Sequence, residues 1–71
     1  MEDKAKRKIR ILVVDDSEVV RVLLKAIFEY EDDMEVIATA ENGQEAIQKA
    51  HELKPDVITM DIRMPVLNGF E

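Results

Sequence analysis

Apolar residues along the chain gather in three short runs, and two longer stretches between the runs show helical periodicity. The runs at 9–14 and 56–61 consist mainly of strand-forming apolar residues, which is typical of strands buried on both faces of a parallel sheet. The run at 35–40 is weaker, because Val36 and Ala38 alternate with more polar or smaller neighbours. We therefore expect three strands, with the one at 35–40 at an edge of the sheet.

Two segments between these strands are predicted to be helices. From 18 to 30, apolar residues recur at helical spacing, and further apolar positions widen the apolar surface beyond one stripe. Ser17 can cap the start of this helix. A second helix spans 44–53 and ends before Pro55, since proline disfavours helix in the residue that precedes it. The expected core positions are Val20, Leu23, Leu24 and Ile27 in the first helix and Ala46, Ile47, Ala50 and Leu53 in the second.

The order βαβαβ predicts an α/β fold with a parallel sheet and crossover helices. If the strand at 9–14 is central, the strand order is 2-1-3 and right-handed crossovers place the two helices on opposite faces. The carboxyl ends of the strands at 9–14 and 56–61 then border one crevice, which is where ligands bind in open α/β sheets. Asp15, Asp16 and Asp61 end these two strands, so we expect the three carboxylates to meet there.

Length and charge narrow the classes of function. With 71 residues, the chain forms at most one small domain, and it has no cysteine for a disulfide or a thiolate metal site. Ten basic against sixteen acidic residues give a net charge of −6, which argues against nucleic acid and membranes as main partners. The basic start at 1–8 is expected to be disordered. The apolar run behind it, at 11–14, is too short for a signal peptide or membrane span, so we expect a cytoplasmic protein.

Three clustered carboxylates suit one kind of chemistry in particular. Like charges repel at such distances unless a cation lies among them, and Mg²⁺ is commonly bound by one or two carboxylates, waters and a phosphoryl oxygen. An aspartate beside such an ion can act as a nucleophile and form an acyl phosphate. The alternative is that Asp15 and Asp16 only cap the following helix and that Asp61 only ends a strand. Spacing alone leaves both interpretations open.

Three motifs in the chain resemble those of a known family. ILVVDDSEVVRVLL from Ile11, ENGQEAI from Glu41 and KPDVITMDIRMPVLNGFE from Lys54 are similar to the first half of a bacterial two-component response-regulator receiver domain. Within the family, the sequences of these motifs are most similar to those of chemotaxis regulators and the chemotaxis methylesterase. The resemblance implies a flavodoxin-like parallel sheet, of which this chain would supply the βαβαβ portion with strand order 2-1-3.

The resemblance also assigns roles to single residues. Asp61 would accept a phosphoryl group from the phosphohistidine of a histidine kinase. Asp16 would bind Mg²⁺ directly, Asp15 directly or through water, and the backbone carbonyl of Arg63 would complete the protein ligands, with Asp61 also facing the ion. The loop after Asp61 would be shaped by Met64, Pro65 and Gly69.

Part of the family pattern has no counterpart in the sequence. Residues 9–71 would form a partial receiver domain that lacks strands 4 and 5 and helices 3 to 5. The family's strand-4 Ser/Thr and strand-5 Lys would lie beyond Glu71, so we expect impaired phosphotransfer. The alternative is a structural half-domain without phosphotransfer, which forms a homodimer or larger homo-oligomer through the open edge of the strand at 56–61.

Other classes of function fit the residues less well. We expect no enzymatic activity: a Mg²⁺-dependent phosphohydrolase would need an Asp-x-Asp pair after the first strand, where this chain has adjacent aspartates, and a nucleotide site would need a glycine-rich loop there. His51 is expected to face solvent. Met60 and Met64 are expected to be packing residues, not ligands, and Lys4 to Arg10 a solvated tail. In a partial domain, the first helix could contribute to an interface through Val22, Ala26 or Phe28.

Overall fold

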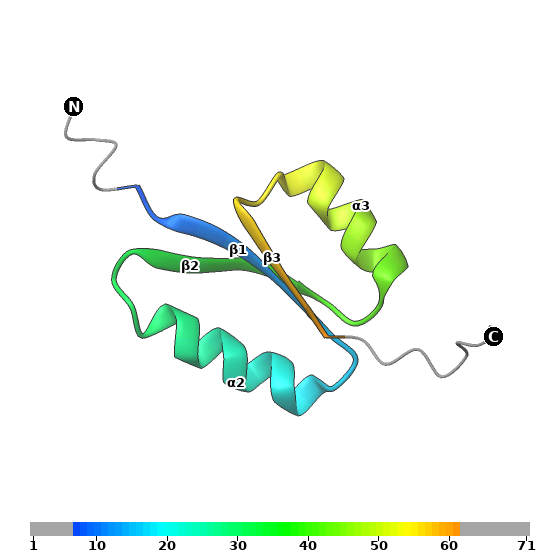
Figure 1. Ribbon diagram of the computed structural model, residues 1–71, viewed down its shortest axis with the longest axis horizontal. Coiled ribbons are helices and arrows are strands. Elements are labelled where there is room, and N and C mark those ends of the chain that lie inside the picture. Colours follow the sequence, from blue (N-terminus) through cyan, green and yellow to red (C-terminus); the bar gives the residue numbers. More distant parts are fainter. Residues whose placement is uncertain (1–6, 62–71) are drawn as a thin grey trace.

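A computed structural model describes residues 7–61, and they form a three-stranded sheet with two helices (Figure 1). All five predicted elements are present, and each differs from its predicted range by one residue at one end. Neither helix of the described part is long and apolar enough to span a membrane. In chain order the elements are β1 (Ile9–Asp15), α2 (Glu18–Glu29), β2 (Met34–Ala40), α3 (Gly43–Leu53) and β3 (Val57–Asp61).

The sheet has the order β2-β1-β3, and both strand pairs are parallel. Helices α2 and α3 lie on opposite sides of the sheet (Figure 1). The predicted fold class, strand order and placement of the helices are therefore confirmed. Because β1 is central, its carboxyl end lies between those of the other two strands, and this arrangement positions the acidic residues described below.

The core is built around β1. The four residues from Ile11 to Val14 are each no more than 2% exposed, because β1 is covered on both faces. Leu12 and Val14 pack with Ala40 and with Ala46 of α3 on one face. On the other face, Ile11 and Val13 pack with Val36 and with two partly buried residues of α2, Leu24 and Phe28. Continuous apolar sequence in β1 thus reflects burial on two sides.

Strand β2 contains an irregularity that the sequence pattern did not reveal. Ile11 pairs with Val36 but Leu12 pairs with Ala38, so Ile37 is an extra residue on β2. Such a bulge shifts the alternation of side chains by one position. As a result Val36 packs on the α2 face and Ala38 on the α3 face, whereas regular alternation would place both on the same face.

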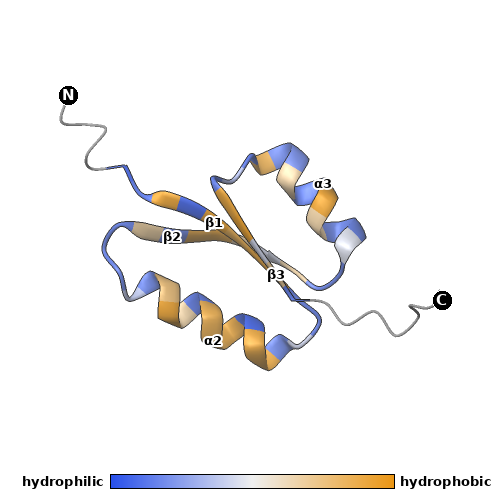
Figure 2. Cartoon of the chain, viewed as in Figure 1, coloured by the Kyte–Doolittle hydropathy of each residue, from blue (hydrophilic) through white to orange (hydrophobic). Residues whose placement is uncertain are grey.

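Several residues expected in the core are exposed. Leu23 and Ile27 of α2 are 55% and 59% exposed, and Ile47 of α3 is 70% exposed, so the prediction that they face the core of the described structure is wrong. The physical reason is that β3 contacts β1 alone among the elements of residues 7–61, and no helix covers it. The hydrophobic colouring of α2 and β3 in Figure 2 therefore includes surface that solvent reaches.

The three candidate interface residues of α2 differ in their exposure to solvent. Phe28 is partly buried and packs against the sheet. Val22 and Ala26 are exposed. They stay candidates for contact with another molecule.

Arg10 connects β1 to the segment between α3 and β3. Its guanidinium donates from Nη1 to the Lys54 carbonyl at 2.9 Å and from Nη2 to the Leu53 carbonyl at 2.8 Å. Its backbone N–H donates to Oδ2 of Asp56 at 2.9 Å, and the Asp56 N–H donates to the Arg10 carbonyl at 2.8 Å. The prediction that the basic stretch through Arg10 is a solvated tail is therefore wrong at Arg10, because its side chain satisfies the last carbonyls of α3.

Side chains and backbone conformation fix the helix ends, and of the two N-caps the one at Ser17 was predicted from the sequence. The Ser17 hydroxyl accepts a hydrogen bond from the Val20 N–H, and the Asn42 side chain accepts one from the Glu45 N–H. Both are N-caps that satisfy otherwise unpaired donors. At the end of α3, Lys54 adopts a left-handed conformation with φ 49° and ψ 63° directly before the proline.

Candidate functional site

The carboxyl ends of β1 and β3 carry the acidic residues of the candidate site. Asp15 and Asp61 are partners in the parallel register of these strands, and Asp16 follows directly. A pocket of about 280 Å³ opens there, and its wall is formed by Asp15, Asp16, Ser17, Val20 and Asp61. The structure thus brings the three aspartates named from the sequence to one pocket at the sheet edge, beside the start of α2.

The three carboxylates differ in their surroundings. Asp15 is only 4% exposed, and its Oδ1 accepts a hydrogen bond of 2.9 Å from the Ser17 N–H. Its backbone carbonyl accepts a hydrogen bond of 2.7 Å from Nη1 of Arg21. Asp16 and Asp61 are exposed. A buried, hydrogen-bonded aspartate therefore lies beside two aspartates that an ion or a phosphoryl group can reach from solvent.

The chemistry of the side chains fits a hard divalent cation. Within residues 7–61, no group of three or more histidine, cysteine or acidic side chains is arranged to hold a metal ion. Mg²⁺ does not need such a group, because it keeps several waters and is usually bound through one or two carboxylates. Asp16 and Asp61 provide carboxylate oxygens on the same pocket. Arg63, Met64, Pro65 and Gly69, for which roles were also predicted, lie outside the described residues.

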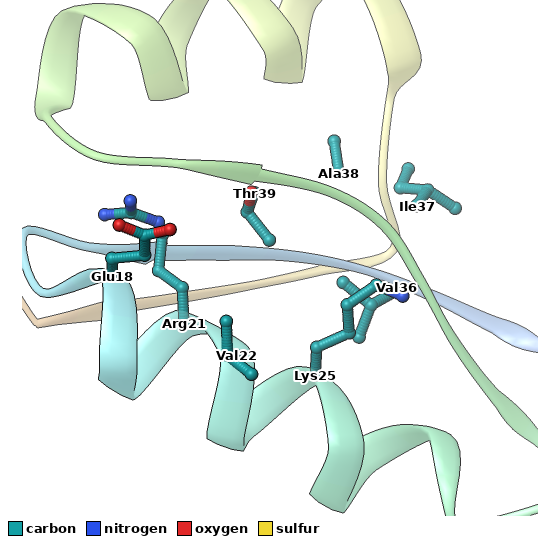
Figure 3. A pocket seen from close by; sticks show the side chains of 8 residues that line it. All are labelled: Glu18, Arg21, Val22, Lys25, Val36, Ile37, Ala38 and Thr39. Carbon is teal, nitrogen blue, oxygen red and sulfur yellow. The ribbon is translucent and has the colours of Figure 1, made fainter.

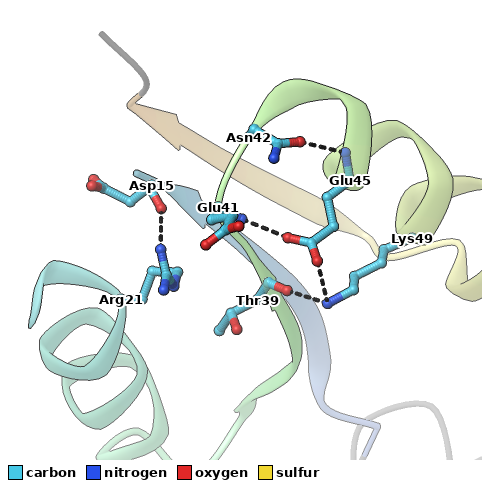
Figure 4. A network of polar contacts seen from close by, with 7 residues as sticks. All are labelled: Asp15, Arg21, Thr39, Glu41, Asn42, Glu45 and Lys49. Carbon is cyan, nitrogen blue, oxygen red and sulfur yellow. Dashed lines mark hydrogen bonds and ion pairs between the residues drawn. The ribbon is translucent and has the colours of Figure 1, made fainter. Parts of the chain in front are cut away.

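A polar network surrounds the end of the neighbouring strand β2 (Figure 4). Lys49 of α3 donates to the Thr39 carbonyl at 2.6 Å and forms an ion pair of 3.8 Å with Glu45. Glu45 in turn accepts a hydrogen bond of 2.8 Å from the Glu41 N–H, and its own N–H donates to Asn42. This network was not predicted from the sequence, although an asparagine three residues before a glutamate is a signal of a capped helix start.

A second hollow lies between α2 and β2 (Figure 3). It measures about 310 Å³, and its wall combines charged and apolar side chains from the two elements. These are Glu18, Arg21, Val22, Lys25, Val36, Ile37, Ala38 and Thr39. Arg21 is the residue that connects this hollow with the aspartates, because its guanidinium reaches the end of β1. This contact of Arg21 was not predicted, because helical periodicity alone carries no signal for it.

Two further residues of the described structure were expected to have no chemical role. His51 is exposed on α3, as expected. Met60 is 58% exposed and does not line the acidic pocket, so the prediction that it is a packing residue is wrong within the described structure. It is exposed for the same reason as the helix residues above, since β3 has no covering element among residues 7–61.

Comparison with known proteins identifies the family. Residues 11–71 match the response regulator receiver domain family. The chain belongs to that family. The receiver assignment made from the three motifs is therefore confirmed. The matched residues include Asp15, Asp16 and Asp61.

Solved receivers share the fold. The response regulator domain of Thermotoga maritima CheB matches 92% of this receiver chain at 60% identity with a TM-score of 0.79. A second match, at 35% identity and a TM-score of 0.73, is a crystal structure of the P1 domain of CheA3 in complex with CheY6 from R. sphaeroides. The chain covers 48% and 50% of the two solved chains.

Curated relatives are longer proteins. Protein-glutamate methylesterase/protein-glutamine glutaminase of Caldanaerobacter subterraneus is 64% identical over 64 residues, and that of Thermotoga maritima is 60% identical over 65 residues. The receiver chain spans 17% and 19% of these two proteins. The transcriptional regulatory protein LnrK of Bacillus subtilis is 52% identical over 63 residues, and the match spans 29% of it. Receiver segments similar to this chain thus occur in proteins with different names.

Proposed function

We propose that this receiver chain accepts a phosphoryl group on Asp61, with Mg²⁺ bound through Asp15 and Asp16. The observation that supports the proposal most strongly is the pocket at the carboxyl ends of β1 and β3, which three aspartates line together. Asp61 is exposed, so a donor can approach it from solvent, and Asp15 is held by the Ser17 N–H within the wall. Family membership supports the same assignment.

The proposed reaction is a transfer between two nucleophiles. A carboxylate oxygen of Asp61 bonds to phosphorus while the bond from phosphorus to the imidazole nitrogen of the donor breaks, and that nitrogen keeps the electron pair. Bound Mg²⁺ supplies neutralisation of the charge on the phosphoryl oxygens. The chain's own contribution is to hold Asp61 at a strand end beside Asp16, so that the nucleophile and the ion ligand share one pocket. This chemistry makes the chain a phosphoacceptor and not an enzyme.

We infer that the phosphoryl donor is a histidine kinase and that the chain acts in the cytoplasm. The solved complex of CheY6 with the P1 domain of CheA3 supports a partner of this kind, since CheY6 shares the fold of this chain. Residues 9–71 correspond to about half of the solved receivers, and we propose that they form a partial receiver domain. We expect slower phosphotransfer than in a receiver that also has the strand-4 hydroxyl and strand-5 lysine of the family.

Acetyl phosphate with Mg²⁺ provides a direct test. Intact mass spectrometry should detect one added phosphoryl group in the original chain and none in Asp61→Asn. Beryllofluoride should give a bound fluorine resonance under the same conditions, again lost in Asp61→Asn. Asp32→Asn is the matched control, because Asp32 is an exposed acid in the turn before β2, at the opposite edge of the sheet. An adduct that persists in Asp61→Asn, or no adduct in any sample, would contradict the proposal.

A second candidate function is self-association through β3. In the sheet formed by residues 7–61, β3 pairs only with β1, so its other edge has no strand beside it. Val57 and Ile58 are each 43% exposed, and Met60 is 58% exposed. An open strand edge with apolar side chains favours pairing with another chain. In this alternative the chain is a structural half-domain that forms a homo-oligomer, and its aspartates transfer no phosphate.

Sedimentation velocity over a range of concentrations tests self-association. A dimer joined along β3 should dissociate in Ile58→Lys, because the charge lies on the joined edge. Ile47→Lys is the control, since Ile47 is a more exposed isoleucine on α3, a helix that does not contact β3 within residues 7–61. A folded monomer at micromolar concentration, or equal weakening by both substitutions, would argue against an interface on β3.

A further inference from the structure

Arg21 contacts the backbone on both sides of Asp16. Its side-chain Nη1 donates to the Asp15 carbonyl at 2.7 Å, and its backbone N–H donates to the Ser17 carbonyl at 3.0 Å (Figure 4 shows the side-chain contact). The carbonyls before and after Asp16 are therefore both hydrogen-bonded to one residue of α2. The backbone contact is an ordinary helical one that any residue would make, but the side-chain contact requires a long donor at position 21.

One further hydrogen bond closes the turn from Asp15 to Ser17. Oδ1 of Asp15 accepts a hydrogen bond from the Ser17 N–H at 2.9 Å, and Asp15 itself is 4% exposed. Asp16 is the residue of this turn whose side chain is exposed, and it lines the acidic pocket. The direction of its carboxylate depends on the two peptide units that flank it. The hydrogen bond from Arg21 restrains the first of these units.

We propose that Arg21 is a positioning residue, which holds the Asp16 carboxylate in the orientation that binds a divalent cation. This inference rests on the proposed function of the acidic pocket. Arg21 does not line that pocket, and its side chain lies instead between the hollow beside β2 and the polar pocket at the end of that strand. It therefore acts on the ion through the Asp15 carbonyl and not by contact.

The sign of the effect separates positioning from charge. Arg21 carries a positive charge close to the aspartates, so its removal on electrostatic grounds alone should strengthen the attraction of the pocket for Mg²⁺. If Arg21 positions Asp16, its removal should instead weaken Mg²⁺ binding. Substitution of groups that orient metal ligands typically lowers metal affinity about 10- to 100-fold. The two explanations thus predict changes in opposite directions.

The experiment is a titration with Mg²⁺ alone, followed by the amide resonances of Asp16 and Ser17 in nuclear magnetic resonance spectra. Arg21→Met should bind Mg²⁺ about 10-fold more weakly than the original chain. Arg21→Lys, which keeps the charge and one donor, should recover part of the lost affinity. Lys49→Met is the matched control, because it also removes a positive charge and a hydrogen bond to a strand-end carbonyl, that of Thr39, but leaves the turn at Asp16 intact.

Each result of this titration has a definite meaning. If Arg21→Met binds Mg²⁺ as tightly as the original chain or more tightly, the positioning role is wrong, but the proposed function is unaffected. Weakening of equal size in Lys49→Met would also overturn it. No Mg²⁺ binding by the original chain would instead refute the ion site itself, and the inference with it. Circular dichroism checks folding, and Arg21→Gln replaces the methionine variant if that variant loses its helical signal.

Discussion

Arg10→Met should destabilise the fold more than removal of the charge of Lys25, whose ion pair lies within α2. The guanidinium of Arg10 donates two hydrogen bonds, of 2.9 Å and 2.8 Å, to the last carbonyls of α3. Methionine keeps the length and the apolar stem of the side chain but has no donor. The substitution therefore leaves two carbonyls at the helix end without a protein partner and removes a cation from the negative end of the helix dipole.

The size of the effect follows from the exposure of these contacts. A hydrogen bond to a charged group contributes about 1.5–3 kcal/mol when shielded. Both bonds of Arg10 are solvent-exposed, and exposed charge pairs contribute about 0.2–1 kcal/mol each. Two such contacts, together with about 0.3–1 kcal/mol from the cation at the negative end of the helix dipole, suggest a total loss of about 1–2 kcal/mol. With roughly 0.05–0.15 kcal/mol of stability per residue, a chain of this length has only several kcal/mol to lose.

Urea unfolding followed by far-ultraviolet circular dichroism measures this loss. For so small a chain, the free energy of unfolding should fall by about 1 kcal/mol for each molar increase in urea. The urea concentration at the unfolding midpoint should therefore fall by about 1–2 M in Arg10→Met. Lys25→Met is the matched control: the Lys25–Glu29 ion pair of 3.3 Å is also exposed but lies within one helix, and its loss should cost only about 0.3–0.5 kcal/mol. A midpoint shift in Arg10→Met no larger than that in Lys25→Met would refute the reasoning.

Three further predictions use different parts of the molecule. Lys54→Gly should raise the free energy of unfolding by about 0.5–1 kcal/mol in urea titrations. Lys54 has a left-handed conformation with φ 49°, which is less favourable for a residue with a Cβ atom than for glycine. A decrease would contradict this prediction. Asn42→Ala should lower it by about 1 kcal/mol through loss of the cap on Glu45, whereas Asn42→Asp should retain it. Saturating Mg²⁺ should raise the thermal midpoint of the original chain but not of Asp16→Asn, and equal shifts in both would show that the ion does not bind at Asp16.

The parts of the fold that follow from periodicity could be predicted from the sequence. Continuous apolar character at 11–14 indicated a central strand, and the two helical stretches required crossovers that place the helices on opposite faces. This topology in turn places Asp15 and Asp61 at the same sheet edge, so the acidic pocket was predictable without any contact information. The N-cap role of Ser17 was predictable for a similar reason, since capping depends on a residue and its immediate neighbours.

The features that were missed depend on contacts between distant parts of the chain. The extra residue at Ile37 changes which face Val36 occupies, and no local pattern marks a bulge without its partner strand. Arg10 was assigned to a solvated tail because its role depends on carbonyls more than 40 positions away. The exposure of Ile47 has a comparable cause: helical periodicity identifies an apolar face, but it does not say whether anything covers that face.

Register connects the contacts of Arg10 with the acidic pocket. The register between β1 and β3 is regular: the pairs run from Ile11 with Val57 to Asp15 with Asp61 without a bulge. The hydrogen bonds that Arg10 and Asp56 exchange lie one position before the first of these pairs and set the same offset. A slip of one residue would turn every side chain of β3 to the opposite face and move Asp61 away from Asp15. The hydrogen bonds of Arg10 and Asp56 at one end of β3 therefore help to hold the alignment that brings the aspartates together at the other end.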